Sequence, residues 1–297
     1  MFSSSVTRRA KSCEIITGPG AQRSTVAQLV TLAMLAVAGC ASHTASSGAP
    51  ADVAETSPGS GYLIGYIDKS RVPNSRQFLP PPPSPGSSAQ QADNLAFNAS
   101  RAVHGTARWN IAAADANLKF PSGLAAFTCA LGFPLSERDT PQLALLLRRS
   151  MTDAALTSTP AKHAYARQRP FVVHKTHTCT PLDEEALAGS GSYPSTHATI
   201  GWAWALLLAE LLPERQNAIL ARGYAFGQSR VVCGVHWQSD VHAGRLVAAA
   251  AVAAQHASAG FGAQMDAARA ELARMAALKT APPAHCAAEQ AALAGDL

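Results

Sequence analysis

Apolar side chains recur at helical spacing through most of the chain from residue 94 onward. The segments predicted to be helical are 94–117 (interrupted at Gly105), 140–156, 162–169, 198–212, 215–228, 241–258 and 261–278. Thr140-Pro141 combines an N-cap residue with proline at the first helical position, and Pro170 is predicted to end segment 162–169. No alternating strand pattern of any length occurs, so the sequence predicts an all-α fold with one bundle-like helical domain.

Segment 198–212 is apolar on every face, and a helix of this kind lies either at the centre of a domain or in a membrane. At about fifteen residues it is shorter than the roughly 20 that span a bilayer. We therefore predict that it is the core helix. Its large apolar residues are Ile200, Trp202, Trp204, Leu206, Leu207, Leu208, Leu211 and Leu212.

Residues 1–39 have the order of a secretory signal rather than of a spanning helix. A basic start is followed by the apolar run Val26–Ala38, and Val37-Ala38-Gly39 stands directly before Cys40. This ending resembles a bacterial lipobox, which implies a lipidated Cys40 and a periplasmic protein anchored to a membrane. Ordinary cleavage nearby, with Cys40 removed or free, is the alternative.

Composition divides the rest of the chain. Residues 40–60 are rich in Ala, Ser, Thr, Gly and Pro and are predicted to form a flexible tether. Residues 61–93 are predicted to form an irregular Pro-rich arm, because the run Pro80–Pro83 suits neither a helix nor a central strand. The helical domain then takes residues 94–280, and residues 281–297 form a C-terminal tail.

The charge of the chain gives no reason to expect a nucleic-acid partner. The sequence has 24 Lys and Arg against 19 Asp and Glu, a net charge of +5. Four of the basic residues and one acidic residue lie in residues 1–39, so the remainder has 20 basic and 18 acidic residues. No basic stripe with interleaved aromatic residues remains, and nucleic acid is not predicted as a partner.

The segment Ser229–Asp240 contains a cation, a possible nucleophile and a carboxylate, namely Arg230, His236 and Asp240. If this part of the chain is helical, Asp240 lies one turn after His236 on the same face and can hold one ring nitrogen. The other ring nitrogen is then presented as a nucleophile.

Two further motifs add positive charge. Lys162 and Arg169 are separated by six residues, which would place them about two helical turns apart on one side. Pro194-Ser195-Thr196-His197 stands before the apolar helix, so the Ser195 hydroxyl and the N–H groups of Ser195 and Thr196 would lie at a positive helix end. Cations, a helix N-terminus, histidines and a carboxylate are what a phosphate-transfer site requires.

In order and spacing, these motifs resemble those of the bacterial class A non-specific acid phosphatases, within the phosphatidic-acid phosphatase and vanadium haloperoxidase superfamily. The family pattern is Lys-x6-Arg-Pro, then Pro-Ser-Gly-His, then Ser-Arg-x5-His-x3-Asp, and Thr196 in place of the glycine is the one departure. The likeness runs from about Gly61 to about Lys279 and includes Ala113–Leu118 and Gly191–Tyr193.

The resemblance implies an exported acid phosphatase that hydrolyses small phosphate monoesters without a metal ion or other cofactor. It makes His236 the nucleophile that forms a phosphohistidine, with Asp240 orienting the ring. It makes His197 the acid that protonates the leaving oxygen and then activates water. It assigns phosphate binding to Lys162, Arg169, Ser195, Thr196 and Arg230.

Several alternatives use the same residues. His236 and Asp240, with His242 nearby, could bind a metal ion, and a vanadium-dependent haloperoxidase would hold vanadate in the same pocket. A non-catalytic phosphate-binding lipoprotein would result if Thr196 has spoiled the site, because threonine is strained at a positive φ that glycine accepts. Asp115 is predicted to be structural, as a cap or an arginine partner. The oligomeric state stays open, a homo-oligomer included.

Four cysteines follow the predicted signal and anchor: Cys129, Cys179, Cys233 and Cys286. An even number in an exported protein suggests two disulfides. Because Cys179 and Cys233 both flank the motifs, we expect them to pair, which leaves Cys129 with Cys286. The sequence alone allows three pairings, and free buried thiols are a further alternative.

Overall fold

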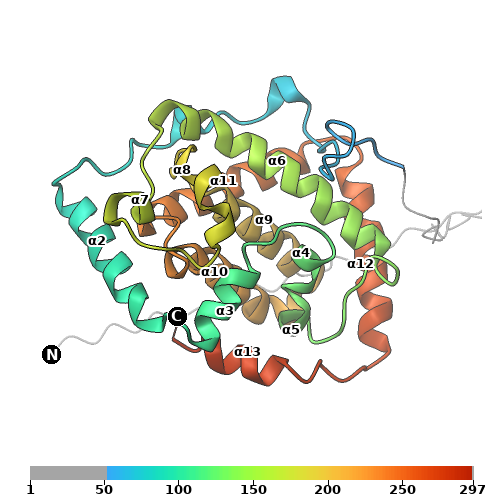
Figure 1. The fold of residues 1–297 in the computed structure, drawn as a ribbon. Coiled ribbons are helices and arrows are strands. Elements are labelled where there is room, and N and C mark those ends of the chain that lie inside the picture. Colours follow the sequence, from blue (N-terminus) through green and yellow to red (C-terminus); the bar gives the residue numbers. More distant parts are fainter. Residues whose placement is uncertain (1–51, 296–297) are drawn as a thin grey trace, which may run out of the picture. The chain divides into compact units, whose positions relative to one another are not determined.

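The computed structural model of the chain describes residues 52–295 (Figure 1). Within these residues the regular secondary structure is helical, with no strand and an isolated β-bridge between Glu55 and Leu63, so the predicted all-α fold is confirmed. The predicted signal peptide at 1–39 and the lipidation candidate Cys40 lie outside the described residues. The helices are α1 Ser75–Phe78, α2 Ser88–Ser100, α3 Ala107–Ala114, α4 Ser122–Ala125, α5 Thr128–Leu131, α6 Pro141–Tyr165, α7 Pro170–His174, α8 Glu184–Ala188, α9 Thr196–Leu211, α10 Gln216–Val232, α11 Gln238–His256, α12 Phe261–Ala277 and α13 Cys286–Leu293.

Helix α9 is the core helix that the apolar segment predicted. It lies among α6, α10, α11 and α12 (Figure 1), and these helices supply its packing contacts. Trp204 of α9 is fully buried, and its indole N–H donates to the carbonyl of Leu147 in α6 at 2.9 Å. The one polar atom of this large side chain therefore has the partner that burial requires.

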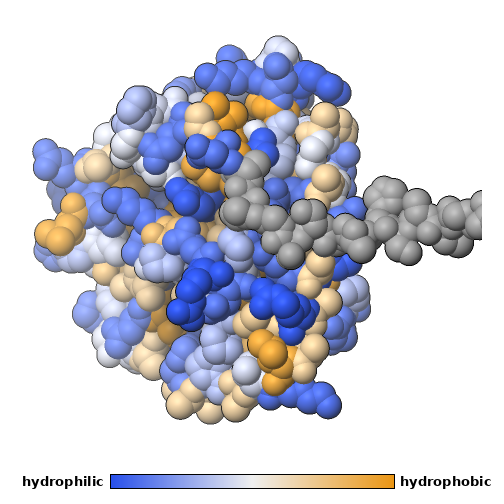
Figure 2. All heavy atoms as spheres, turned by 90° about the vertical axis from the view of Figure 1, so that its right-hand side faces the viewer, coloured by the Kyte–Doolittle hydropathy of each residue, from blue (hydrophilic) through white to orange (hydrophobic). Residues whose placement is uncertain are grey.

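Helix α12 covers one side of the core with an amphipathic face. Phe261, Met265 and Leu272 are buried against the core. On the side of the molecule that carries α12, hydrophilic residues cover most of the surface and hydrophobic ones form small, separate patches (Figure 2). Across residues 52–295 no single helix has the length and hydrophobicity of a membrane span, and α11 with α12 reaches them only as a pair bent by 102°.

The predicted helix over 162–169 is wrong. Helix α6 continues to Tyr165, so Lys162 lies in its last turn, and α7 begins at Pro170 with Arg169 as its extended N-cap residue. Proline has no N–H to lose at the first position of a helix and its φ suits that position, so Pro170 starts a helix instead of ending one. The two cations therefore reach the site from the end of one helix and the start of the next.

Helix α6 passes through Pro160, which the sequence did not predict. A proline inside a helix removes one hydrogen bond of the ladder and disturbs its neighbours. Here the N–H of Ala161 donates to the hydroxyl of Ser75 in α1 at 3.1 Å. The short helix α1 therefore supplies a partner where the ladder of α6 is interrupted.

The N-terminal arm is packed on α6. Residues 61–93, predicted to be irregular, contain α1 and the first turns of α2. The N–H groups of Tyr66 and Ile67 donate to the two carboxylate oxygens of Asp153 at 2.9 and 3.2 Å. A Cβ at Gly65 would lie 1.9 Å from Asp153 Oδ1, so this close approach requires glycine.

Both predicted disulfides form in the structure. Cys129 pairs with Cys286 and joins α5 to α13, a helix within the predicted tail 281–297. Cys179 pairs with Cys233 and joins the segment after α7 to the C-cap of α10. The second bond therefore braces the chain directly before the turn that leads into α11.

Candidate active site

The three motifs meet at the junctions between helices. Lys162 lies at the end of α6, Ser195 caps α9, and the segment from Arg230 to Asp240 leads from α10 into α11. The Lys162 ammonium donates to the carbonyl of Pro194 at 2.6 Å, and the N–H of Ser195 donates to the carbonyl of Asp240 at 3.0 Å. Direct hydrogen bonds thus tie the motifs into one site.

His236 and Asp240 are close, but not as neighbours on one helix. His236 precedes α11, Trp237 is the N-cap residue, and Asp240 lies in the first turn. Asp240 Oδ2 accepts the N–H of Trp237 at 2.8 Å and lies 3.5 Å from His236 Nδ1. At this distance Nδ1 faces the carboxylate without making a hydrogen bond to any described residue. Helix capping, rather than helical spacing, produces the pairing that the sequence suggested.

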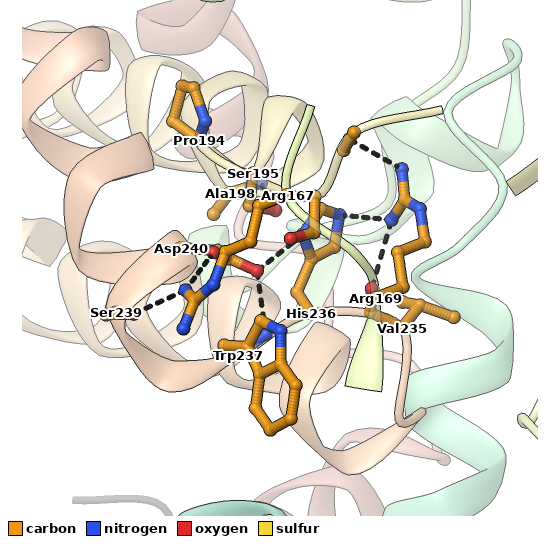
Figure 3. Close-up of polar contacts among 12 residues, drawn as sticks. Arg167, Arg169, Pro194, Ser195, Ala198, Val235, His236, Trp237, Ser239 and Asp240 are labelled. Carbon is orange, nitrogen blue, oxygen red and sulfur yellow. Dashed lines mark hydrogen bonds and ion pairs between the residues drawn. The ribbon is translucent and has the colours of Figure 1, made fainter. Parts of the chain in front are cut away.

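The hydrogen bond to the other ring nitrogen indicates the protonation of His236. Arg169 Nη1 lies 3.0 Å from His236 Nε2, and a guanidinium can only donate. The Nε2 atom therefore carries a lone pair, and the ring proton sits on Nδ1 toward Asp240 (Figure 3). Burial, followed by Arg169, Lys162 and Arg230, holds the pKa of His236 well below its usual range. The ring is therefore neutral, as a nucleophile must be.

His197 presents its ring in the opposite sense. Its Nε2 lies 3.0 Å from the carbonyl oxygen of Ala116, which can only accept, so Nε2 carries the proton and Nδ1 is left to exchange one. Burial, followed by Arg230, holds the pKa of His197 well below its usual range, although the bond to Ala116 opposes this. A bound anion would work against these cations and favour the protonated ring.

Arg230 is a buried cation with two nitrogen atoms that have no partner in the described part of the chain. Its side chain is 2% exposed, and neither Nε nor Nη1 has a hydrogen-bond partner among the described residues. Burial, followed by the charge of Arg169, lowers the pKa of Arg230 to about 10, so it stays charged at neutral pH. An unsatisfied buried donor costs about 1–3 kcal/mol, more when charged, which an anion in the site would offset.

Lys162 and Arg169 are held by carbonyl oxygens rather than by carboxylates. Lys162 donates to Gly191 and Pro194, at 3.0 and 2.6 Å. Arg169 donates to the carbonyls of Leu187 at 2.8 Å and Val235 at 3.0 Å. Carbonyl dipoles fix both side chains, and the charge of Asp240 raises the pKa of both without a hydrogen bond to either, so the pocket stays positive.

At the start of α9, the N–H of Ser195 does not have the role that the sequence predicted. Ser195 is buried, its Oγ accepts the N–H of Ala198 at 3.3 Å, and its own N–H is taken by the carbonyl of Asp240. The N–H of Ser195 is therefore not available to a phosphate, contrary to our expectation. Thr196 and His197 occupy the first turn, where N–H groups have no acceptor within the helix.

Thr196 fits its position without the conformational freedom of glycine. It is the first residue of α9 and is not among the residues with positive φ. Its hydroxyl lies 2.7 Å from the hydroxyl of Ser158, one turn before Lys162 on α6. The departure from the family pattern thus ties α9 to the helix that carries Lys162.

Arg167 and Asp93 were not predicted from the sequence. Arg167 donates to Asp240 at 2.6 Å and to Asp93 at 2.7 Å, and it approaches the His236–Asp240 pair from the side opposite Arg169 (Figure 3). One signal was present: Asp93 lies four residues before Phe97 on the buried side of α2, where an acid needs a partner.

The remaining candidates lie outside this site or serve the fold. Asp115 binds Arg222, as the structural interpretation predicted. His242 is exposed, and its Nε2 lies 2.9 Å from Gln238 Nε2, so it does not join His236 and Asp240 in a metal-binding group.

Residues 143–260 match the family model of the PAP2 superfamily. The chain is 43% identical over 211 residues to a non-specific acid phosphatase of Providencia stuartii, covering 71% of this chain and 85% of the relative. It is 45% identical over 195 residues to an acid phosphatase of Zymomonas mobilis, covering 66% and 74%. It is 42% identical over 177 residues to a non-specific acid phosphatase of Salmonella typhimurium, covering 59% and 71%.

Proposed function

Because this chain is a class A acid phosphatase of the PAP2 superfamily, we propose that it hydrolyses phosphate monoesters through a phosphohistidine at His236, without a metal ion. One observation carries the mechanism: the Nε2 lone pair of a neutral, buried His236 is held by Arg169, in a pocket where Arg230 has unpaired donors. Both features suit attack on a dianionic phosphoryl group.

The first step forms the covalent intermediate. The phosphoryl oxygens take donors from Arg230, Lys162 and the first turn of α9, which gives the unpaired nitrogen atoms of Arg230 their acceptors. Arg169 Nη1 releases the Nε2 lone pair and donates to a phosphoryl oxygen instead. His236 Nε2 then forms a bond to phosphorus, and the bond from phosphorus to the leaving oxygen breaks. The leaving oxygen takes the bond's electron pair and a proton from Nδ1 of His197. Positive charge on the His236 ring is stabilised by Asp240 beside Nδ1.

In the second step His197 acts as a base, whereas in the first step it acted as an acid. His197, now neutral, accepts a proton from water as the water oxygen attacks phosphorus. The bond from phosphorus to Nε2 breaks, its electron pair returns to His236, and inorganic phosphate leaves. The same pair of histidines is then ready for another substrate.

The charge distribution of the site supports metal independence. Lys162, Arg169 and Arg230 supply positive charge around the phosphoryl position and would repel a divalent cation. Elsewhere in the described chain, the trio Cys129, His285 and Cys286 has metal-ligand proximity, but its cysteines form a disulfide. Activity should therefore survive a chelator, and loss with recovery on added zinc would contradict this part of the proposal.

Trapping the intermediate tests the mechanism directly. Enzyme quenched during turnover of a 32P-labelled monoester should carry label on the peptide that contains His236. His236→Ala should abolish both the label and turnover, whereas His197→Ala should retain labelling with a substrate whose leaving group needs no proton. Label on another residue, or turnover by His236→Ala, would overturn the assignment.

We also propose that the enzyme is exported to the periplasm and anchored by lipid at Cys40. Support comes from the signal-like residues 1–39 and from two disulfides, which persist in oxidising compartments. Fractionation of cells expressing the full chain tests this proposal. Cys40→Ala should move activity from the membrane fraction to the soluble periplasmic fraction, and an unchanged distribution would contradict lipid anchoring.

A further inference from the structure

Arg167 lies between two buried carboxylates. One Nη donates to Asp240 Oδ1 at 2.6 Å and to the Ser239 hydroxyl at 2.8 Å. The other donates to Asp93 Oδ2 at 2.7 Å and to Gln90 Oε1 at 2.6 Å. The side chains of Arg167, Asp93 and Asp240 are 8%, 3% and 0% exposed, so water contributes little to holding this arrangement.

Asp240 depends on Arg167 for its charge. Burial raises the pKa of Asp240, and the Arg167 guanidinium is the strongest influence in the opposite direction, ahead of the N–H of Trp237. A protonated Asp240 could not stabilise the imidazolium that forms when His236 is phosphorylated. The cation is therefore needed for the carboxylate to do its work.

Arg167 also fixes the direction of the carboxylate. Asp240 Oδ1 is bound by Arg167, and Oδ2 accepts the N–H of Trp237 and faces His236 Nδ1. With a donor at each oxygen, the carboxylate plane has little freedom to rotate, and Figure 3 shows it set between Arg167 and the imidazole. Orientation of this kind is what a catalytic histidine obtains from its carboxylate partner.

Asp93 extends the arrangement to α2. Besides binding Arg167, it accepts the N–H and the hydroxyl of Ser239 at 2.8 and 2.6 Å, at the first turn of α11. A single residue of α2 thus holds both the guanidinium and the start of the helix that carries Asp240. Asp93 lies outside residues 143–260, the part of the chain that matches the superfamily model.

We propose that Arg167, held in place by Asp93, is a positioning residue that keeps the Asp240 carboxylate aligned with His236 Nδ1, so that α2 belongs to the catalytic apparatus. This inference rests on the proposed function, because it concerns the partner of the proposed nucleophile. Neither Arg167 nor Asp93 needs to touch substrate in this role.

A double-mutant cycle between Arg167 and Asp240 tests the proposal. Arg167→Lys should lower kcat for p-nitrophenyl phosphate by about 10- to 100-fold, with KM nearly unchanged, because misplacement of a supporting group affects the transition state most. In an Asp240→Asn background the same Arg167→Lys change should have little further effect on kcat. Equal losses in both backgrounds would mean that Arg167 does not act through Asp240, and would overturn the inference.

Two further variants keep the test decisive if Arg167→Lys folds poorly. Asp93→Asn should lower kcat less than Arg167→Lys does. Each of the two variants should move the acidic limb of the kcat/KM profile to higher pH, because a less firmly held cation lets the pKa of Asp240 rise. Arg222→Lys is the matched control, since Arg222 is a buried arginine paired with an aspartate away from the site. It should lower the unfolding temperature without moving the limb.

The outcomes separate this inference from the mechanism on which it rests. Suppose that Asp93→Asn leaves the acidic limb of the kcat/KM profile in place and lowers only the unfolding temperature, as Arg222→Lys does. Arg167 and Asp93 would then have only a structural role. A labelled phosphoenzyme at His236 would stand in that case. Turnover by His236→Ala would instead contradict the proposed function itself, whatever the cycle shows.

Discussion

Helix α10 carries two buried arginines with opposite surroundings. Arg222 is 5% exposed, and its guanidinium binds both oxygens of Asp115, at 2.5 and 3.1 Å, with Glu289 3.4 Å away. Arg230, about two turns later, is 2% exposed, and its Nε and Nη1 have no partner in the described protein. One helix therefore holds a cation that the fold satisfies and another that it leaves unsatisfied.

The contrast extends to the groups around each arginine. Near Arg222, the Ser229 hydroxyl also donates to Asp115, and Arg108 donates to Ser229, so donors and acceptors match. Near Arg230, Arg169 and the two histidines add positive charge or none, and the carboxylates of Asp115 and Asp183 raise its pKa without binding Nε or Nη1. A buried charge costs several kcal/mol unless it is paired, so the first cluster stabilises the fold and the second indicates a binding site for an anion.

Replacing Arg230 should have the largest effect on activity. Arg230→Met is expected to lower kcat/KM by about 10²- to 10³-fold, because it removes donors aimed at the charge of the transition state. In the absence of phosphate, its unfolding temperature should be equal to or higher than that of the unmodified enzyme, since an unpaired buried charge has gone. Steady-state kinetics and thermal unfolding measure the two effects.

Inorganic phosphate sharpens this prediction. Saturating phosphate should raise the unfolding temperature of the unmodified enzyme and raise that of Arg230→Met far less, because a ligand stabilises only the state that binds it. A marked loss of stability in phosphate-free Arg230→Met would mean that Arg230 is paired in the folded enzyme. The comparison between the two arginines would then fail.

Replacing Arg222 should have the opposite effect. Arg222→Met leaves Asp115 buried without its cation and should lower the free energy of unfolding by about 3–5 kcal/mol. At temperatures where the variant is folded, kcat per active site should stay within a few-fold of the original value. Denaturant unfolding and active-site titration measure these quantities, and a large fall in kcat of the folded variant would contradict a purely structural role.

The helices that were predicted from the sequence are those with strong local signals. The apolar segment now seen as α9 and the Thr140-Pro141 start of α6 needed no tertiary information. The predicted helix at 162–169 was wrong because Pro170 can begin a helix as well as prevent one, and packing decides which. Local pattern cannot settle a choice that tertiary contacts make.

The same limit applies to the site. Lys162, Arg169, Arg230, His197, His236 and Asp240 were identifiable because their spacing matched a known family, and the structure brings them together. Arg167 escaped notice because its partner Asp93 is 74 residues away in the sequence. The N–H of Ser195 was predicted to be available because its acceptor, the carbonyl of Asp240, comes from another helix.

The uncompensated charge of the site should also appear in its pH dependence. Burial, followed by Arg169, lowers the pKa of Lys162 to about 7. Above this pH the free enzyme loses one of its cations, so kcat/KM should fall by about tenfold per pH unit on the alkaline side, giving a maximum on the acidic side of neutrality. Lys162→Arg should move the alkaline limb upward by about one unit or more, because arginine keeps its charge.

The stability of the empty enzyme gives an independent check. Because the folded pKa of Lys162 is below its ordinary value of 10.5, the unfolded chain binds more protons between about pH 7 and 10.5. The contribution of Lys162 to stability therefore increases as pH rises through this window and is lost as pH falls toward 7.

The kinetic prediction has its own contrary outcome. An alkaline limb of the kcat/KM profile that stays in place in Lys162→Arg would assign that limb to the proton on His197 instead of the charge of Lys162.

The smallest expected effect concerns Thr196, a residue of the candidate active site whose hydroxyl has a hydrogen-bond partner in the fold. Thr196→Gly removes the 2.7 Å contact between the hydroxyls of Thr196 and Ser158 and adds backbone freedom at the first residue of α9. Ser158 keeps its bond to the carbonyl of Ala155 at 2.8 Å, so no buried hydroxyl is orphaned. The free energy of unfolding should fall by about 1–2 kcal/mol, the sum of one hydrogen bond and the entropic cost of glycine.

Activity should respond less than stability, because Thr196 is helical without strain and needs no glycine conformation. We expect kcat/KM for p-nitrophenyl phosphate to change by less than about threefold, below the roughly 1.4 kcal/mol that a tenfold change represents. Ser158→Ala is the matched control, since it breaks the same contact and leaves the backbone of α9 unchanged. If Thr196→Gly alters kcat/KM by more than tenfold while Ser158→Ala does not, backbone freedom at the start of α9 governs phosphate binding. Thr196 would then belong with the catalytic cations and not with the paired groups that stabilise the fold.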